Sequence, residues 1–121
     1  MMFCGIDLVE IERIEKSLKN PRFLEKNFGE REREELAKKS YKSESVAAAF
    51  AAKEAFLKAM QTGLSGFALC EIELLHKESG APYLSLSGKA KSQVEEKGLE
   101  FSVSITHTSK LAQAIVIGFE K

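Results

Sequence analysis

The spacing of hydrophobic residues changes from a helical period in the first half of the chain to alternation in the second. The chain opens with a short apolar run, Phe3 to Val9, which predicts a strand. Ile11, Ile14 and Leu18 then recur at helical spacing, which predicts a helix over about residues 10–19. The first half therefore begins as a strand followed by a helix.

Helix-breaking residues separate the next two elements. Asn20 and Pro21 end the first helix, and Pro21 suits the first turn of a short second helix over residues 22–24. Gly29 precedes a highly charged stretch, residues 30–39, which predicts a solvated helix.

A long alanine-rich helix comes next, extending to about Gln61. Ser43 or Ser45 is expected to cap it, and the segment 62–66, with two glycines, ends it. Because small side chains let other backbone pack closely, we expect this helix to be buried on several faces.

The second half of the chain alternates polar and apolar residues in short runs separated by turn residues, which is typical of antiparallel strands. Together with the helices of the first half, this predicts an α+β fold in which an antiparallel sheet packs against a long central helix and shorter helices. With no repeat or linker visible, we expect a single domain over residues 1–121. The expected elements are a hairpin of strands 71–75 and 83–86, a helix over 89–97 closed by Gly98, and strands over 101–106 and 112–119.

Composition adds mainly exclusions. The chain has 18 basic and 18 acidic residues, so its net charge gives no reason to expect nucleic-acid or membrane binding. No apolar run approaches the roughly 18 residues of a membrane span, and the N-terminus lacks the basic flank of a signal peptide. Cys4 and Cys70 lie in apolar segments without metal-ligand spacing, so we expect buried, reduced thiols and a cytoplasmic protein.

The alanine-rich helix carries the first chemical signal. Between Val46 and Met60 its only charged residues are Lys53, Glu54 and Lys58. A buried carboxylate is costly unless a cation or hydrogen bonds receive it. Glu54 and Lys58 are four apart, so they either form a structural ion pair along the helix or belong to a functional site.

Asp7 lies inside the apolar opening strand, where Asp is disfavoured. It is either an N-cap of the following helix or part of a site. Asp7 and Glu54 together are hard oxygen ligands of the kind that Mg²⁺ prefers, and Lys58 beside them would hold a phosphate.

The strand over residues 101–106 ends on a hydroxyl-rich turn bearing His107. Such a turn offers several donors to a phosphate or nucleotide, although a lone histidine at a strand end is also common as a surface residue. The sequence has no spacing typical of an acyl-transfer triad, a P-loop or a Rossmann glycine pattern.

Four blocks of this sequence resemble the holo-acyl-carrier-protein synthase family, the small class of 4′-phosphopantetheinyl transferases. The resemblance covers the chain from end to end, in the same order and at near-family length. The blocks are Gly5-Ile6-Asp7-Leu8-Val9-Glu10-Ile11-Glu12-Arg13-Ile14, Arg22-Phe23, Phe50-Ala51-Ala52-Lys53-Glu54-Ala55 and Ser104-Ile105-Thr106-His107-Thr108.

The resemblance implies a function. Members of the family transfer the 4′-phosphopantetheine arm of coenzyme A to a serine of acyl carrier protein, in fatty acid biosynthesis, and release adenosine 3′,5′-bisphosphate. They are trimers with active sites at subunit interfaces, and Mg²⁺ lies between enzyme carboxylates and the pyrophosphate. Carried onto this chain, the expected metal ligands are Asp7 and Glu54, the catalytic residues Glu54 and Lys58, the coenzyme A contacts Lys42, Lys58, Gly63, Ser104, Thr106 and His107, and the carrier-protein contacts Arg13 and Arg22.

The chain departs from the family pattern at three places. Ala48 and Ala49 stand where the family often has Gly-Arg, Ala81 replaces a common lysine, and a second glycine near Cys4 is absent. These changes leave the expected metal site intact. They leave open which cations hold the 3′-phosphate of coenzyme A, for which Lys42 is one candidate.

Two roles stay open at this level. The serine proton goes either to Glu54 or to a water bound to the metal. Arg13 and Lys16, three apart on one helix, either dock the acidic carrier protein or belong to an ordinary solvated face, since Glu10, Glu12 and Glu15 are interleaved with them.

Two other classes of protein compete with the enzyme. A non-catalytic oligomeric module that binds coenzyme A or another nucleotide would explain the hydroxyl-rich strand end but not an Asp and a Glu together on buried elements. A structural domain with satisfied buried ion pairs would need no Mg²⁺.

Overall fold

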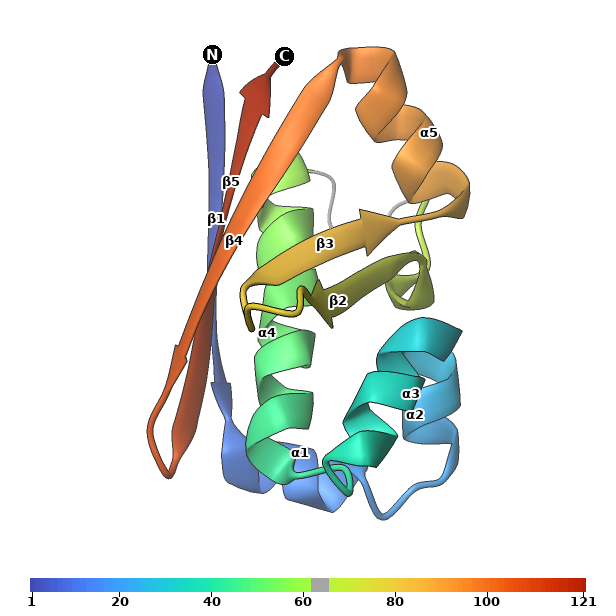
Figure 1. The fold of residues 1–121 in the computed structure, drawn as a ribbon, viewed down its shortest axis with the longest axis vertical. Helices are drawn as coiled ribbons and strands as arrows, with labels where there is room; N and C mark the ends of the chain where they lie inside the picture. The colour runs from blue at the N-terminus through green and yellow to red at the C-terminus, as the bar shows by residue number, and fades with distance from the viewer. Residues whose placement is uncertain (62–65) are drawn as a thin grey trace.

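The computed structural model describes residues 1–61 and 66–121, and it has the expected α+β arrangement (Figure 1). A three-stranded antiparallel sheet has the order β1-β5-β4, and the expected hairpin forms a separate two-stranded sheet, β2-β3. The strands are β1 (Met2–Glu10), β2 (Ile72–His76), β3 (Pro82–Leu86), β4 (Leu99–His107) and β5 (Leu111–Glu120); the helices are α1 (Ile11–Ser17), α2 (Arg22–Asn27), α3 (Glu30–Lys38), α4 (Ser43–Met60) and α5 (Gly88–Lys97), with a 3₁₀ turn η1 (Leu69–Glu71).

The long helix α4 packs across one face of the three-stranded sheet (Figure 1). Strand residues alternate between the two faces, so β1 directs Gly5, Asp7 and Val9 toward α4. Across β5, Asp7 pairs with Ala114, and Ala114 pairs with Ile105 of β4. Asp7 and Ile105 therefore lie on the same face of the sheet, at its two outer strands.

Gly5 permits an unusually close contact between β1 and α4. A Cβ at this position would overlap the carbonyl oxygen of Ala55 and lie 2.6 Å from the amide nitrogen of Ala59. Because these are backbone atoms of a helix, they cannot move aside as a flexible side chain would. Glycine and the facing alanines thus set how near the strand and its Asp7 come to the helix.

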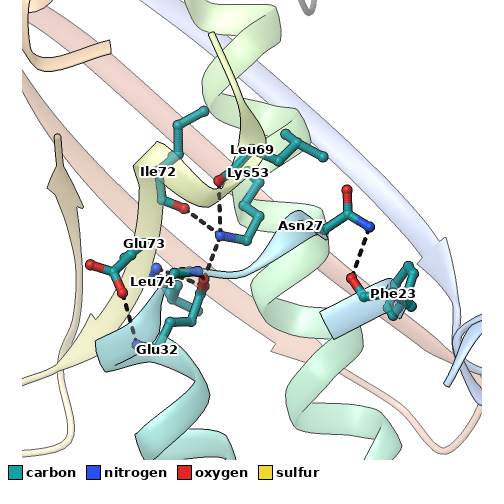
Figure 2. Close-up of polar contacts among 9 residues, drawn as sticks. Phe23, Asn27, Glu32, Lys53, Leu69, Ile72, Glu73 and Leu74 are labelled. Carbon is teal, nitrogen blue, oxygen red and sulfur yellow. Dashed lines mark hydrogen bonds and ion pairs between the residues drawn. The ribbon is translucent and has the colours of Figure 1, made fainter. Parts of the chain in front are cut away.

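A buried ion pair, shown in Figure 2, joins α4 to α3. The Lys53 ammonium donates hydrogen bonds to the Glu32 carboxylate and to the carbonyl oxygens of Leu69 and Ile72. Glu32 also accepts hydrogen bonds from two backbone N–H groups. Burial lowers the pKa of Lys53 and raises the pKa of Glu32, and their mutual attraction opposes both shifts.

This pair corrects the expectation that residues 30–39 form a solvated helix. Glu32 is 1% exposed and Leu36 is 6% exposed, so one face of α3 belongs to the core. The reason is that Lys53 is itself fully buried and needs an anionic partner.

Three expectations about local structure are also corrected or decided. The N-cap of α4 is Lys42, without a side-chain cap hydrogen bond, and Ser43 is already helical. The N-cap of α1 is Glu10, so Asp7 is a strand residue and not a cap. Cys4 and Cys70 are free, but Cys4 is exposed and Cys70 half-buried, because Cys4 lies on the face of β1 that points away from α4.

Both chain ends lie at the same end of the sheet (Figure 1). The N-terminal ammonium is 3.7 Å from Glu120 Oε1. In the described part of the chain, every helix is too short or too polar to cross a bilayer.

Replacing Gly5 by alanine should push β1 away from α4. We expect the free energy of unfolding to fall by about 2 kcal/mol or more, as for overpacking against rigid backbone. Chemical denaturation followed by circular dichroism measures this. Gly80→Ala is the control: this glycine has a positive φ of 92° but no atom within 4 Å of an added Cβ, so its cost is backbone strain without overlap. Wild-type stability for Gly5→Ala would contradict the packing argument.

Candidate active site

Asp7, Glu54 and Lys58 meet on one flank of α4, beside β1. The Lys58 ammonium lies 3.0 Å from Asp7 Oδ1 and donates a second hydrogen bond, also of 3.0 Å, to the carbonyl of Ile6. The Lys58 side chain is 56% exposed, whereas that of Asp7 is 16% exposed. A largely buried carboxylate is thus paired with a lysine whose side chain is mostly exposed.

Glu54 has a different environment. Lys58 reaches toward β1, and no ion pair between described residues joins it to Glu54. Burial raises the pKa of Glu54, the nearby charge of Asp7 raises it further, and Lys58 and Arg13 oppose the shift. Two carboxylates therefore repel each other here, and an added cation between them would relieve the repulsion.

Asp7 and Glu54 line a surface cleft of about 340 Å³ between β1, α1, α2 and α4. Its lining includes Asp7, Glu54 and Arg13, with Phe23 and Phe50 beside them. The cleft thus combines two acids, a guanidinium and an apolar wall.

The second expected docking residue is nearby. Arg22 lines a neighbouring cleft of about 220 Å³, which shares Ser17 and Phe23 with the first. Arg13 and Arg22 are therefore on adjoining surfaces.

The carboxylates fit a magnesium ion by their chemistry. Mg²⁺ commonly takes one or two carboxylates and completes its shell with water and substrate phosphate. Asp7 and Glu54 supply two such oxygen donors from separate elements, within electrostatic reach of each other. Among residues 1–61 and 66–121, no group of three or more His, Cys, Asp or Glu side chains is placed to hold a metal.

Lys42 and His107 lie on the other flank of α4, toward β4. They line a cleft of about 440 Å³ together with Lys39, Glu44 and Ser45. This cleft continues into one of about 250 Å³ that is walled by α3, α4, the β2–β3 hairpin and the end of β4. One chain therefore places these two residues and the acids Asp7 and Glu54 in separate clefts.

Two other residues expected to contact coenzyme A, Ser104 and Thr106, line none of these clefts in the described structure. Ser104 and Thr106 are exposed on the sheet face opposite α4, because they alternate along β4 with the inward Ile105. In register they stand across from Ile115 and Gln113 of β5. Gly63 lies outside the described residues.

Comparisons with known proteins agree on one family. A family model described as the 4′-phosphopantetheinyl transferase superfamily matches residues 3–115. The chain belongs to this superfamily. The resemblance noted from the sequence is thereby confirmed, and with it the enzyme class, a phosphopantetheinyl transferase.

Individual relatives match over nearly their whole length. The holo-[acyl-carrier-protein] synthase of Caldanaerobacter subterraneus subsp. tengcongensis is 46% identical over 96% of this chain and 93% of its own. The solved Chronobacterium ammoniagenes ACPS–CoA complex superposes with a TM-score of 0.87 at 29% identity, over 100% of this chain and 98% of that one. The Helicobacter pylori holo-[acyl-carrier-protein] synthase in complex with coenzyme A gives 0.83 at 33% identity, over 96% and 99%.

Some cleft residues of this transferase were not singled out from the sequence. Phe23 and Phe50 were noted only within family blocks, yet they line the acidic cleft. On the other flank, His76 pairs with Glu35 at 3.0 Å and lines the 250 Å³ cleft. The alternation of β2 could have indicated His76, because it places this residue on the same face of the strand as the buried Leu74.

Proposed function

We propose that this protein transfers the 4′-phosphopantetheine arm of coenzyme A to a serine of apo acyl carrier protein, with Mg²⁺, releasing adenosine 3′,5′-bisphosphate. The observation that carries the proposal is that Asp7 and Glu54, on otherwise buried elements, line one cleft and that Lys58 is paired with Asp7 beside it. Relatives named as synthases of this kind, and solved relatives in complex with coenzyme A, support the substrates. We treat residues 1–121 as one transferase domain working in the cytoplasm, which the two free cysteines support.

In this mechanism Asp7 and Glu54 hold the magnesium ion. When bound, the ion supplies neutralisation of the pyrophosphate charge. Lys58, whose side chain is more than half exposed, turns its ammonium to a phosphate oxygen and stabilises the departing group. Glu54 accepts the proton of the serine hydroxyl as the reaction begins.

The bond changes are a simple displacement. The serine oxygen bonds to the phosphorus that carries the pantetheine arm, and the bond from that phosphorus to the bridging oxygen breaks. The bridging oxygen leaves with adenosine 3′,5′-bisphosphate, and Lys58 neutralises its charge. Positioning and charge neutralisation carry most of such a transfer.

We further propose a homotrimer with active sites between subunits, as the family resemblance implies. Two features support association of this chain with itself. The sheet face away from α4 exposes Ile6 and Leu8 at 50% and 57%, so it offers an apolar surface. In addition, Lys42 and His107 lie across α4 from Asp7 and Glu54. For all four residues to contact one coenzyme A molecule, one subunit would have to supply the cleft with the acids and a neighbouring subunit the cleft with Lys42 and His107.

The direct experiment is intact-mass measurement of an apo carrier protein after incubation with coenzyme A, Mg²⁺ and the enzyme. The expected result is a gain of one phosphopantetheine arm. Coenzyme A that is bound but never consumed would instead support a non-catalytic binding module.

Substituting the two acids should separate their roles. Glu54→Gln removes the proton acceptor and one metal ligand while keeping the shape, so we expect a folded protein with transfer reduced by about a thousandfold or more. Asp7→Ala should shift the Mg²⁺ titration of activity to higher concentration. Glu34→Gln, an exposed acid on α3, is the control. Unimpaired turnover by Glu54→Gln would remove Glu54 from the chemistry.

Reversing the charge of Arg13 tests docking. Because Arg13 lines the cleft beside Glu54, Arg13→Glu should raise the KM for the carrier protein about tenfold and leave that for coenzyme A unchanged. Lys91→Glu reverses an exposed charge on α5 and should change neither. Equal losses for both substrates would count against a docking role.

The assembly is tested on the outer sheet face. Ile6→Glu places a charge in the apolar surface, so we expect light scattering to show a fall from three copies to one, with loss of transfer. Ser92→Glu adds a charge to the exposed face of α5 and should keep the assembly. An unchanged mass for Ile6→Glu would refute association through this face.

A further inference from the structure

The ion pair of Lys53 and Glu32 binds together three separate parts of the fold (Figure 2). Lys53 belongs to α4, Glu32 to α3, and the carbonyl groups that Lys53 contacts lie at η1 and at the start of β2. Of the ion pairs in the described part of the chain, it alone has both side chains buried, at 0% and 1% exposure.

Stability alone is a weak reason for such a pair. Hydrophobic residues of similar volume often pack as well or better than a buried ion pair, because they avoid the cost of removing two charges from water. Unlike apolar contacts, hydrogen bonds are directional, and in some proteins a buried polar group fixes which of several packings forms. The three hydrogen bonds of Lys53 are made only when the segments that they join lie at the observed separation.

Three of those segments, α3, α4 and β2, line the 250 Å³ cleft. Ser45 and Ala49 line it, and Lys53 follows them at the same four-residue spacing along one side of α4. On the opposite wall, Leu74 lines the cleft and its N–H donates to Glu32 Oε2 at 2.9 Å. The pair thus lies behind the cleft, in contact with the backbone of one wall and part of the helix that forms the other.

A second contact joins α3 and β2 nearer the opening. The backbone N–H of His76 donates to Glu35 Oε2 at 3.3 Å, and the His76 ring nitrogen Nδ1 lies 3.0 Å from Glu35 Oε1. With Glu73, which accepts the N–H of Glu32 at 2.9 Å, these contacts make α3 and β2 one unit. Among the described residues, Lys53 then links that unit to α4 through side-chain hydrogen bonds.

We propose that Lys53 and Glu32 are positioning residues that set the distance between the two walls of this cleft and thereby its affinity for coenzyme A. The inference rests on the proposed function, since it takes the cleft with Lys42 and His107 at its mouth as the coenzyme A site. Neither residue touches the substrate; both act through the segments that they hold in place.

The test is calorimetric binding of coenzyme A to the assembled protein, followed by steady-state kinetics with both substrates. Glu32→Gln removes the anion and keeps the shape, so the Kd and KM for coenzyme A should rise about tenfold while the KM for the carrier protein stays unchanged. A merely structural role would lower the active fraction, and so kcat, with both KM values unchanged. That result would overturn the proposal.

Glu32→Asp covers the case in which Glu32→Gln does not fold. It keeps the charge but shortens the reach, so it should stay folded by circular dichroism and weaken coenzyme A binding about threefold. Wild-type affinity in folded Glu32→Asp would overturn the proposal. Glu34→Gln, two residues away on the exposed side of α3, should bind as wild type. If wild-type protein binds coenzyme A but transfers nothing, the proposed function fails while the binding comparison still decides this inference.

Discussion

The close packing of β1 on α4 is the constraint on which the rest of the structure depends. Gly5 lets the strand approach until only backbone atoms of Ala55 and Ala59 limit it. Asp7, two residues further along the same face of the strand, is thereby held against the part of α4 that carries Glu54 and Lys58. A larger residue at position 5 would move an acid away from its partners, so the glycine serves the chemistry as well as the packing.

Consecutive residues of α4 point to different sides of the helix, and this separates a structural lysine from a glutamate of the proposed active site. Lys53 and Glu54 are neighbours in sequence, yet a step of about 100° around the helix points them to different sides. Lys53 faces α3 and β2, where every donor of its ammonium is used inside the core. Glu54 faces β1 and α1, where its carboxylate borders an open cleft. Of these two adjacent residues, Lys53 therefore has a structural role in the core, whereas Glu54 lies at the proposed active site.

Much of this fold can be predicted from patterns in the sequence, and the exceptions share a cause. Alternation identified the strands of the second half and helical spacing identified α1, because burial of one face produces those periods directly. The first strand was predicted instead from its short apolar run. Composition failed at α3: seven of its nine residues are charged, which hides the burial of Glu32. The partner Lys53, far away in sequence, and the backbone N–H of Leu74, farther still, help to make that burial favourable. Likewise, Asp7, Glu54, Lys42 and His107 were all predicted from the sequence as site residues. Only the three-dimensional packing shows that the two acids lie on one flank of α4 and that Lys42 and His107 lie on the other.

Because α4 carries essential residues on two of its sides, insertions and deletions within this helix should not be tolerated. One residue inserted between Ala49 and Lys53 would turn everything beyond it by about 100° and move it along the axis by about 1.5 Å. The ammonium that anchors α3 and the acid beside β1 would then both face the wrong neighbours. We expect natural variants of this protein to gain and lose residues in the connections between elements, and to keep the number of residues within α4 unchanged.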